Sequence, residues 1–206
     1  MKTRIAVFVS GGGTNLQALI DAQNAGKIPS GEIVLVISGN PDAYALQRAS
    51  KAGIETAVIS RRTAGSQEKA EEQMLACLSE HGIQMIILAG YMSILSEDFI
   101  KSFPGPIINV HPALIPSFCG KGFYGLKVHE AALEKGVKVT GATVHYVNEI
   151  PDGGEIIFQK AVEVLPGDTP EILQRRVMEQ AEWILLPKAA ELTARKILEE
   201  DKNEAE

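Results

Sequence analysis

The sequence of 206 residues is poor in the features that mark secreted, membrane-spanning or disulfide-stabilised proteins. It has only two cysteines, Cys77 and Cys119, too few for a disulfide framework, so a reducing, cytoplasmic location is expected. No apolar run approaches the length of a membrane helix. The apolar stretch after Lys2 and Arg4 is also too short for a signal peptide. We therefore expect no membrane partner.

The sequence also lacks an excess of positive charge. Its 20 Lys and Arg residues are outnumbered by 26 Asp and Glu residues, so the formal net charge is −6. This balance argues against the wrapping of nucleic acid by a basic surface. No cluster of residues has the spacing of metal ligands, so no metal is predicted. With 45% apolar residues, no internal repeat and no linker, residues 1–206 fit one globular domain.

Short apolar segments alternate with amphipathic helical segments along most of the chain. This pattern is typical of a doubly wound α/β fold with a mostly parallel sheet. The last two strands flank a turn, which predicts an antiparallel element in the C-terminal half. Pro187 is expected to interrupt or kink the last helix, and the acidic tail after Leu198 to fray. The expected strands are 4–9, 33–37, 56–59, 85–88, 107–110, 140–147 and 156–164. Four expected helices cover residues 44–52, 67–81, 97–102 and 128–133. Two further helices are expected to begin near residue 14 or 15 and near residue 169.

A glycine-rich loop, Ser10–Asn15, follows the first strand and precedes the first helix. Glycines let the backbone approach a ligand closely, and the unpaired N–H groups at a helix start attract anions. The loop therefore predicts a phosphate site, although a tight turn that merely needs glycine torsions remains the alternative. It is no dinucleotide fingerprint, because Leu16 occupies the place of the third glycine.

Two polar residues, Asn109 and His111, end the apolar strand that Pro112 terminates. Their spacing of two places both side chains on one side of the strand. The carboxyl end of a parallel strand is where α/β sheets hold ligands. There an amide can donate to a developing oxyanion and an imidazole can carry a proton. A strand end whose polar side chains meet solvent is the other interpretation.

Other candidate residues leave alternatives open from the pattern alone. The loop around Met92–Leu95 either forms the wall of a flat ligand site or packs in the core. His145 is either a second polar group of the site or a solvent-facing strand residue. His129 is expected at the surface, and Asp152 alone is an ordinary turn residue. The segment Pro112–Gly125 has the length and composition of a mobile active-site lid.

Three motifs together carry a resemblance to a known family. They are Asn109-x-His111-Pro112, Leu114-Ile115-Pro116 and Asp152-Gly153-Gly154, with the glycine-rich loop in front. From Ile5 to about Pro187 the sequence resembles the folate-dependent formyltransferases. The resemblance implies their three-layer, Rossmann-like fold and Asn109, His111 and Asp152 as catalytic residues. It further implies formyl transfer from 10-formyltetrahydrofolate to the amine of glycinamide ribonucleotide in purine synthesis, without a metal.

The resemblance also implies a division of binding roles. An N-terminal half, about 1–105, would bind the ribonucleotide phosphate, and a C-terminal half, about 106–198, would bind folate and hold the catalytic residues. The implied ribonucleotide residues are Gly13, Thr14, Asn15 and Glu182. The implied folate residues are Met92, Ser93, Ile94, Leu95, Asn109, Val147 and Gln67, with His145 behind the catalytic set.

The sequence departs from the family at Ser93, where an arginine is frequent, and at Gln67, where a basic residue is frequent. Arg61 or Arg62 is the expected replacement for the lost positive charge.

Two other family activities and one non-enzymatic role compete with this interpretation. Formyltetrahydrofolate hydrolase shares the catalytic set but usually carries an extra N-terminal domain, whereas this chain begins at its first strand. Methionyl-tRNA formyltransferase carries a basic C-terminal domain, whereas this chain ends in an acidic tail. A non-catalytic nucleotide-binding module would bind through the glycine-rich loop without turnover. A monomer and a homodimer are both compatible with the sequence.

Overall fold

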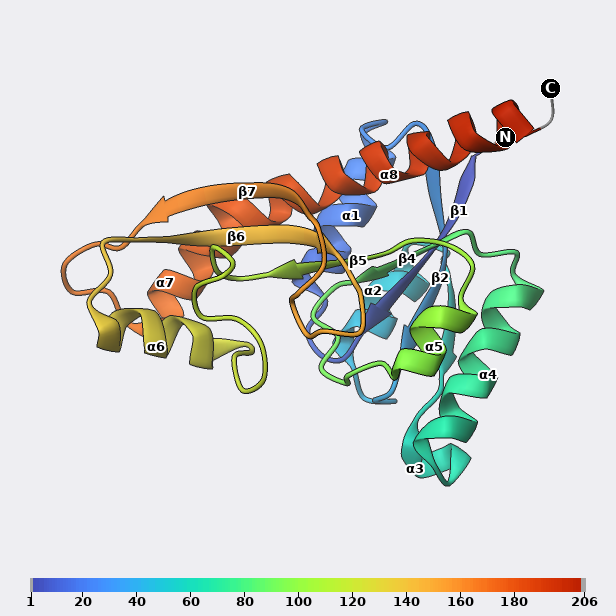
Figure 1. Ribbon diagram of the computed structural model, residues 1–206, viewed down its shortest axis with the longest axis horizontal. Coiled ribbons are helices and arrows are strands. Elements are labelled where there is room, and N and C mark those ends of the chain that lie inside the picture. Colours follow the sequence, from blue (N-terminus) through green and yellow to red (C-terminus); the bar gives the residue numbers. More distant parts are fainter. Residues whose placement is uncertain (1, 205–206) are drawn as a thin grey trace.

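A computed structural model describes residues 2–204 and shows one seven-stranded sheet in the order β3-β2-β1-β4-β5-β6-β7 (Figure 1). Neighbouring strands from β3 to β5 are parallel, whereas β5 to β7 are antiparallel. This confirms the predicted sheet and its antiparallel element. The strands are β1 (Thr3–Val9), β2 (Gly31–Ser38), β3 (Glu55–Val58), β4 (Met85–Leu88), β5 (Ile107–His111), β6 (Val139–Tyr146) and β7 (Ile156–Glu163).

Helices cover both faces of the sheet and complete the three predicted layers (Figure 1). On one face α1, α2, α6, α7 and α8 enclose a core with the buried Leu16, Ala45 and Leu186, and on the other α4 and α5 bury Met74 and Phe99. The helices are α1 (Thr14–Asn24), α2 (Tyr44–Lys51), α3 (Arg61–Ala64), α4 (Gln67–Glu80), α5 (Glu97–Ser102), α6 (Leu126–Lys135), α7 (Pro170–Val177), the π-helix η1 (Met178–Glu182) and α8 (Trp183–Glu204).

The carboxyl ends of β1 and β4 meet in the middle of the parallel part of the sheet. The strand order runs outward from this pair in both directions, so it is the topological switch point at which α/β sheets bind ligands. A hydrogen bond ties the two loops together there, because the Met92 N–H donates to Ser10 Oγ over 2.9 Å. The glycine-rich loop and the loop after β4 therefore form one rim.

The C-terminal helices differ from the sequence prediction. Pro187 lies inside α8, and the irregularity falls earlier, at the π-helix η1, whose wider turns break the α-helical ladder. The acidic segment after Leu198 continues α8 to Glu204, so the expected fraying there is wrong for the described residues. The short helix α3 was not predicted; Ser60 caps it by accepting from the Thr63 N–H. Within residues 2–204, no helix is long and apolar enough to cross a membrane.

Candidate active site

Strand β5 brings Asn109 and His111 to the same edge of the sheet, as their spacing predicts. The antiparallel strand β6 lies beside it and places His145 opposite Asn109. The Asn109 Nδ2 atom lies 3.3 Å from His145 Nε2. His145 is only 2% exposed, which excludes the interpretation as a solvent-facing strand residue. The side chain of His111 is buried as well.

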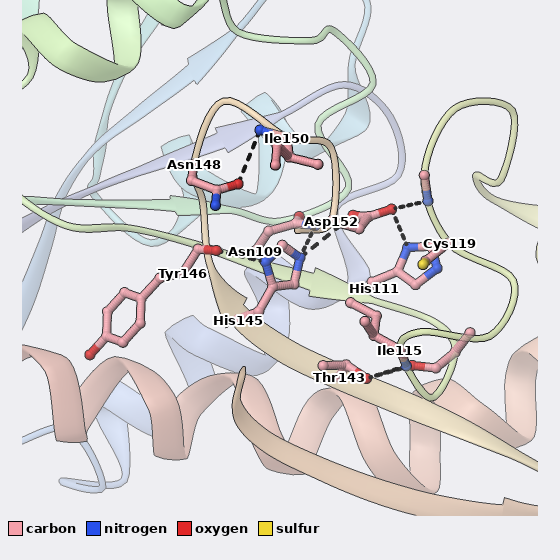
Figure 2. Close-up of polar contacts among 12 residues, drawn as sticks. Asn109, His111, Ile115, Cys119, Thr143, His145, Tyr146, Asn148, Ile150 and Asp152 are labelled. Carbon is pink, nitrogen blue, oxygen red and sulfur yellow. Dashed lines mark hydrogen bonds and ion pairs between the residues drawn. The ribbon is translucent and has the colours of Figure 1, made fainter. Parts of the chain in front are cut away.

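Asp152 reaches these residues from the loop between β6 and β7 (Figure 2). Its Oδ2 atom lies 3.6 Å from His111 Nδ1, and its Oδ1 atom lies 3.5 Å from His145 Nε2. The Gly120 N–H donates to Asp152 Oδ2 over 2.8 Å. The structure thus brings Asn109, His111, His145 and Asp152 into one cluster, although the last two are about 40 residues away from the first two along the chain.

Carbonyl groups fix the position of one hydrogen on each imidazole ring. A carbonyl oxygen can only accept, so His111 Nε2 donates to the Phe118 oxygen over 2.8 Å, and His145 Nδ1 donates to the Tyr146 oxygen over 2.8 Å. The remaining nitrogen of each ring faces Asp152. Burial by itself would raise the pKa of Asp152, but hydrogen bonds from His145 and Gly120 and the charge of His111 hold it below its ordinary value.

A cleft of about 840 Å³ opens onto this cluster. Its lining includes a second polar pair, in which Asn15 Nδ2 donates to Glu182 Oε2 over 2.7 Å. Glu182 lies in the π-helix η1 and is 5% exposed, and its burial raises the pKa to about 7 against the opposing effect of Asn15. The cleft is lined by elements from the whole chain, including Asn15, Gly90–Ile94, Asn109–Pro112, His129, Asp152, Met178 and Glu182.

The start of α1 is an uncapped helix N-terminus. Gly13 precedes it in the left-handed region with φ 71°, no side chain caps the helix, and its first turn holds no acidic residue. This arrangement leaves N–H groups for an anion. Packing also demands Gly13, because a Cβ atom there would lie 2.6 Å from Ala45 Cβ. Asn15 reaches the cleft, whereas Thr14 lines a separate groove between α1 and α8.

The predicted folate residues gather beside the cluster of Asn109, His111, His145 and Asp152. A small cavity of about 130 Å³ is lined by Ser93, Ile94, Leu95, Val147, Asn109 and Asp152, among others. Met92 lines the adjoining cleft instead. Gln67 lies in the next groove, where its Nε2 donates to Glu71 Oε1 over 3.0 Å and to the Ile94 oxygen over 3.1 Å. Arg61 and Arg62 line that same groove, which places them within one surface with Gln67.

Some residues of the site were missed from the sequence. His129 was expected at the surface, but it is fully buried and lines the cleft. Both of its ring nitrogens lack hydrogen-bond partners among the described residues, and burial together with His111 lowers its pKa to about 4. In the sequence, the burial of His129 was indicated by its position on the same helical face as apolar residues of α6. Phe118 and Gly120 act through backbone atoms, which no side-chain pattern reveals. In the part of the chain that is described, no group of three His, Cys, Asp or Glu residues is arranged to hold a metal ion.

The fold and the cluster agree with one protein family. A model of the formyl transferase family matches residues 3–189, which are most of the chain. The chain therefore belongs to the formyl transferase family. This confirms the family that the motifs around Asn109, His111 and Asp152 predicted.

Individual relatives carry more specific names. The phosphoribosylglycinamide formyltransferase of Haemophilus influenzae is 41% identical over 86% of this chain and 81% of that protein. The trifunctional purine biosynthetic protein adenosine-3 of Gallus gallus is 46% identical over 94% of this chain, but the match spans only 18% of its length. The crystal structure of glycinamide ribonucleotide transformylase 1 from Symbiobacterium toebii has a TM-score of 0.88 and 40% identity, covering 95% of this chain and 89% of that one.

Proposed function

We propose that this chain transfers a formyl group from 10-formyltetrahydrofolate to the amine of glycinamide ribonucleotide in purine biosynthesis. Family membership and the names of the relatives support formyl transfer and the two small-molecule substrates. The observation that carries the proposal is the convergence of Asn109, His111 and Asp152 at one end of a cleft whose other end holds Asn15 and Glu182. One cleft can thus hold both a reacting centre and an anchored amine.

The proposed reaction joins an amine to the formyl carbon and breaks the bond from that carbon to N10 of the folate. The electron pair of the formyl group moves onto its oxygen during attack, so a donor is needed there. Asn109 Nδ2 carries two hydrogens and can donate one of them to the oxyanion. The amine must lose one proton and N10 must gain one. Asp152, held ionised between His111 and His145, is suited to accept and return that proton.

The ribonucleotide is proposed to bind across the start of α1. The backbone of Gly13, Thr14 and Asn15 would hold the phosphate, because the helix dipole and the uncapped N–H groups favour an anion. Glu182 would contact the ribonucleotide beside Asn15. Binding residues for this substrate then come from both halves of the chain.

The folate is proposed to bind on the other side of the cluster. Met92–Leu95 and Val147 would line the pterin pocket, next to Asn109. Gln67 stabilises the position of this loop through the Ile94 carbonyl, and Arg61 or Arg62 can meet the acidic tail of the folate along the shared groove. These residues fall on both sides of position 105, so the proposed halves share the folate site.

A single assay tests transfer against hydrolysis, the activity that could use the same catalytic residues. Release of tetrahydrofolate is followed with 10-formyltetrahydrofolate alone and with glycinamide ribonucleotide added. A transferase needs the amine held close to the formyl carbon and water kept away. We expect release only with the ribonucleotide, in equal amount to the formylated product. Sustained release without it would favour a hydrolase, and no release from folate-bound protein would favour a non-catalytic module.

A further inference from the structure

The segment Phe118–Gly120 lies in the loop between β5 and α6. Its backbone contacts both His111 and Asp152, the pair of proposed catalytic residues. The Phe118 carbonyl accepts from His111 Nε2 over 2.8 Å, and the Gly120 N–H donates to Asp152 Oδ2 over 2.8 Å. The circuit closes where His111 Nδ1 lies 3.6 Å from that same Asp152 oxygen. Figure 2 shows the Asp152 carboxylate between the His111 ring and this loop.

The backbone is strained at two points of this circuit. Phe118 with φ 50° and Asp152 with φ 56° are the two non-glycine residues of positive φ in the span 2–204. Such a torsion costs about 1–2 kcal/mol for a side chain like that of Phe118, so surrounding contacts must hold it there, whereas aspartate adopts it more readily. Both residues take part in the hydrogen bonds of the circuit. The coincidence indicates that the loop backbone is shaped to meet the two catalytic side chains.

We propose that the Phe118–Gly120 backbone is a positioning device for catalysis: its carbonyl sets which nitrogen of His111 carries hydrogen, and its amide orients the Asp152 carboxylate. With Nε2 committed to Phe118, Nδ1 of His111 always faces Asp152. With one lone pair of Oδ2 committed to Gly120, the carboxylate keeps its face toward both imidazoles. Displacement of this loop then disables the pair even though both side chains remain. The inference rests on the proposed formyl transfer.

The charged and titratable groups around Asp152 are few. His111 on β5 and His145 on β6 face its oxygens, and the Cys119 thiol lies between the two backbone contacts. His129 on α6 faces His111 from the other side. The Gly120 N–H is one of the groups that hold the pKa of Asp152 below its ordinary value. Loss of this one donor should therefore raise that pKa.

The test compares proline at two glycines of the same loop. Gly120→Pro removes the N–H donor whatever torsions the chain adopts, because proline has no amide hydrogen. Gly122→Pro is the matched control, since both glycines have positive φ and open space around an added Cβ. The titration of Asp152 is read by ¹³C NMR of its carboxyl carbon. The hydrogen position on His111 is read by ¹⁵N NMR, and neither readout requires turnover.

In Gly120→Pro we expect the Asp152 titration to move up by about one pH unit and the ¹⁵N shift of His111 Nε2 to change, because the displaced loop weakens its hydrogen bond to Phe118. The acid limb of kcat/KM should move up with it. Gly122→Pro imposes the same torsional conflict on the loop but keeps the Gly120 N–H, so its Asp152 titration should move less than that of Gly120→Pro. Equal titrations in the two variants would overturn the proposal. If Gly120→Pro does not fold, Gly120→Val takes its place, because a β-branched residue is expelled from positive φ. Normal NMR shifts in a chain without formyl transfer would instead count against the proposed function.

Discussion

The two ends of the cleft hold carboxylates that the fold treats in opposite ways. Asp152 lies between two imidazoles and accepts a backbone N–H, so its pKa is held below the ordinary value despite burial. Glu182 is more deeply buried and has a neutral amide, Asn15, as its hydrogen-bond donor, so burial raises its pKa to about 7. Both line the same cleft. The depth of burial and the partners of an acid together decide its charge.

This contrast matches the roles proposed for the two ends. A group that moves protons during transfer must be ionised when the amine attacks, and imidazoles around Asp152 provide for this. A group that recognises a neutral part of a substrate has no such need. At Glu182 the carboxyl can change its charge near neutral pH, so the ribonucleotide binding proposed there is expected to depend on pH.

Removing the groups at the Asp152 end should give the largest effect. We expect Asn109→Ala and Asp152→Asn each to lower kcat by at least about 10²-fold, because the oxyanion donor or the proton carrier is lost. Asparagine tolerates positive φ, so Asp152→Asn keeps the turn at φ 56°. Steady-state rates and circular dichroism of the purified variants provide the measurement.

Asp42→Asn serves as the control for this pair, since it removes one exposed carboxylate outside the cleft. It should leave kcat within about twofold of the wild type, as surface changes usually do. Near-normal turnover in Asn109→Ala or Asp152→Asn, with the fold intact, would remove these residues from the proposed mechanism.

The sequence predicted one end of the cleft better than the other. Asn109 and His111 are two apart on one strand, so local periodicity places them together. Asp152 was found because a family motif connects it to them, while its contact with Gly120 depends on two loops that meet only in the fold. The parallel sheet was predictable for a similar reason, since each strand has its own apolar pattern.

Features that depend on long-range packing escaped the sequence prediction. The π-helix η1 turns Glu182 toward Asn15, and helical periodicity alone gives no sign of that extra residue in the turn. The burial of His129 also depends on how α6 packs against α7. A polar residue type gives no indication of this packing in the sequence. Gly13 was interpreted as a ligand-binding glycine, but the neighbouring Ala45 of α2 requires it as well.

The Glu182 end should show its buried acid in the pH dependence of stability. The folded pKa of about 7 lies above the ordinary 4.5, so the stabilising protonated form is fully present below pH 4.5 and is lost as the pH rises through 7. Relative to Glu182→Gln, the wild type should lose about 3 kcal/mol of unfolding free energy between pH 4.5 and 8. Urea unfolding of both proteins across this range measures the difference.

Glutamine is a suitable replacement at this position because its amide oxygen can still accept from Asn15, while it cannot ionise. Any other pH-dependent group contributes equally to both proteins and cancels in the comparison. A difference that stays constant from pH 4.5 to 8 would mean that Glu182 is ionised throughout, and the contrast with Asp152 would disappear.

The smallest expected effect concerns His129, whose side chain lies in the cleft wall. Unlike Asp152 and Glu182, it has no hydrogen-bond partner among the described residues. Its two ring nitrogens are buried without hydrogen bonds among the described residues, and such groups cost about 1–3 kcal/mol each. We expect His129→Leu to raise the unfolding free energy by about 1 kcal/mol at pH 7.5, part of the gain being offset by imperfect packing of the new side chain. At His81, where the ring is bonded to the Cys77 carbonyl and Glu55, the same substitution should lower stability instead. Urea unfolding compares the two variants, and a loss of stability in His129→Leu as large as in His81→Leu would show that the buried imidazole is satisfied in solution.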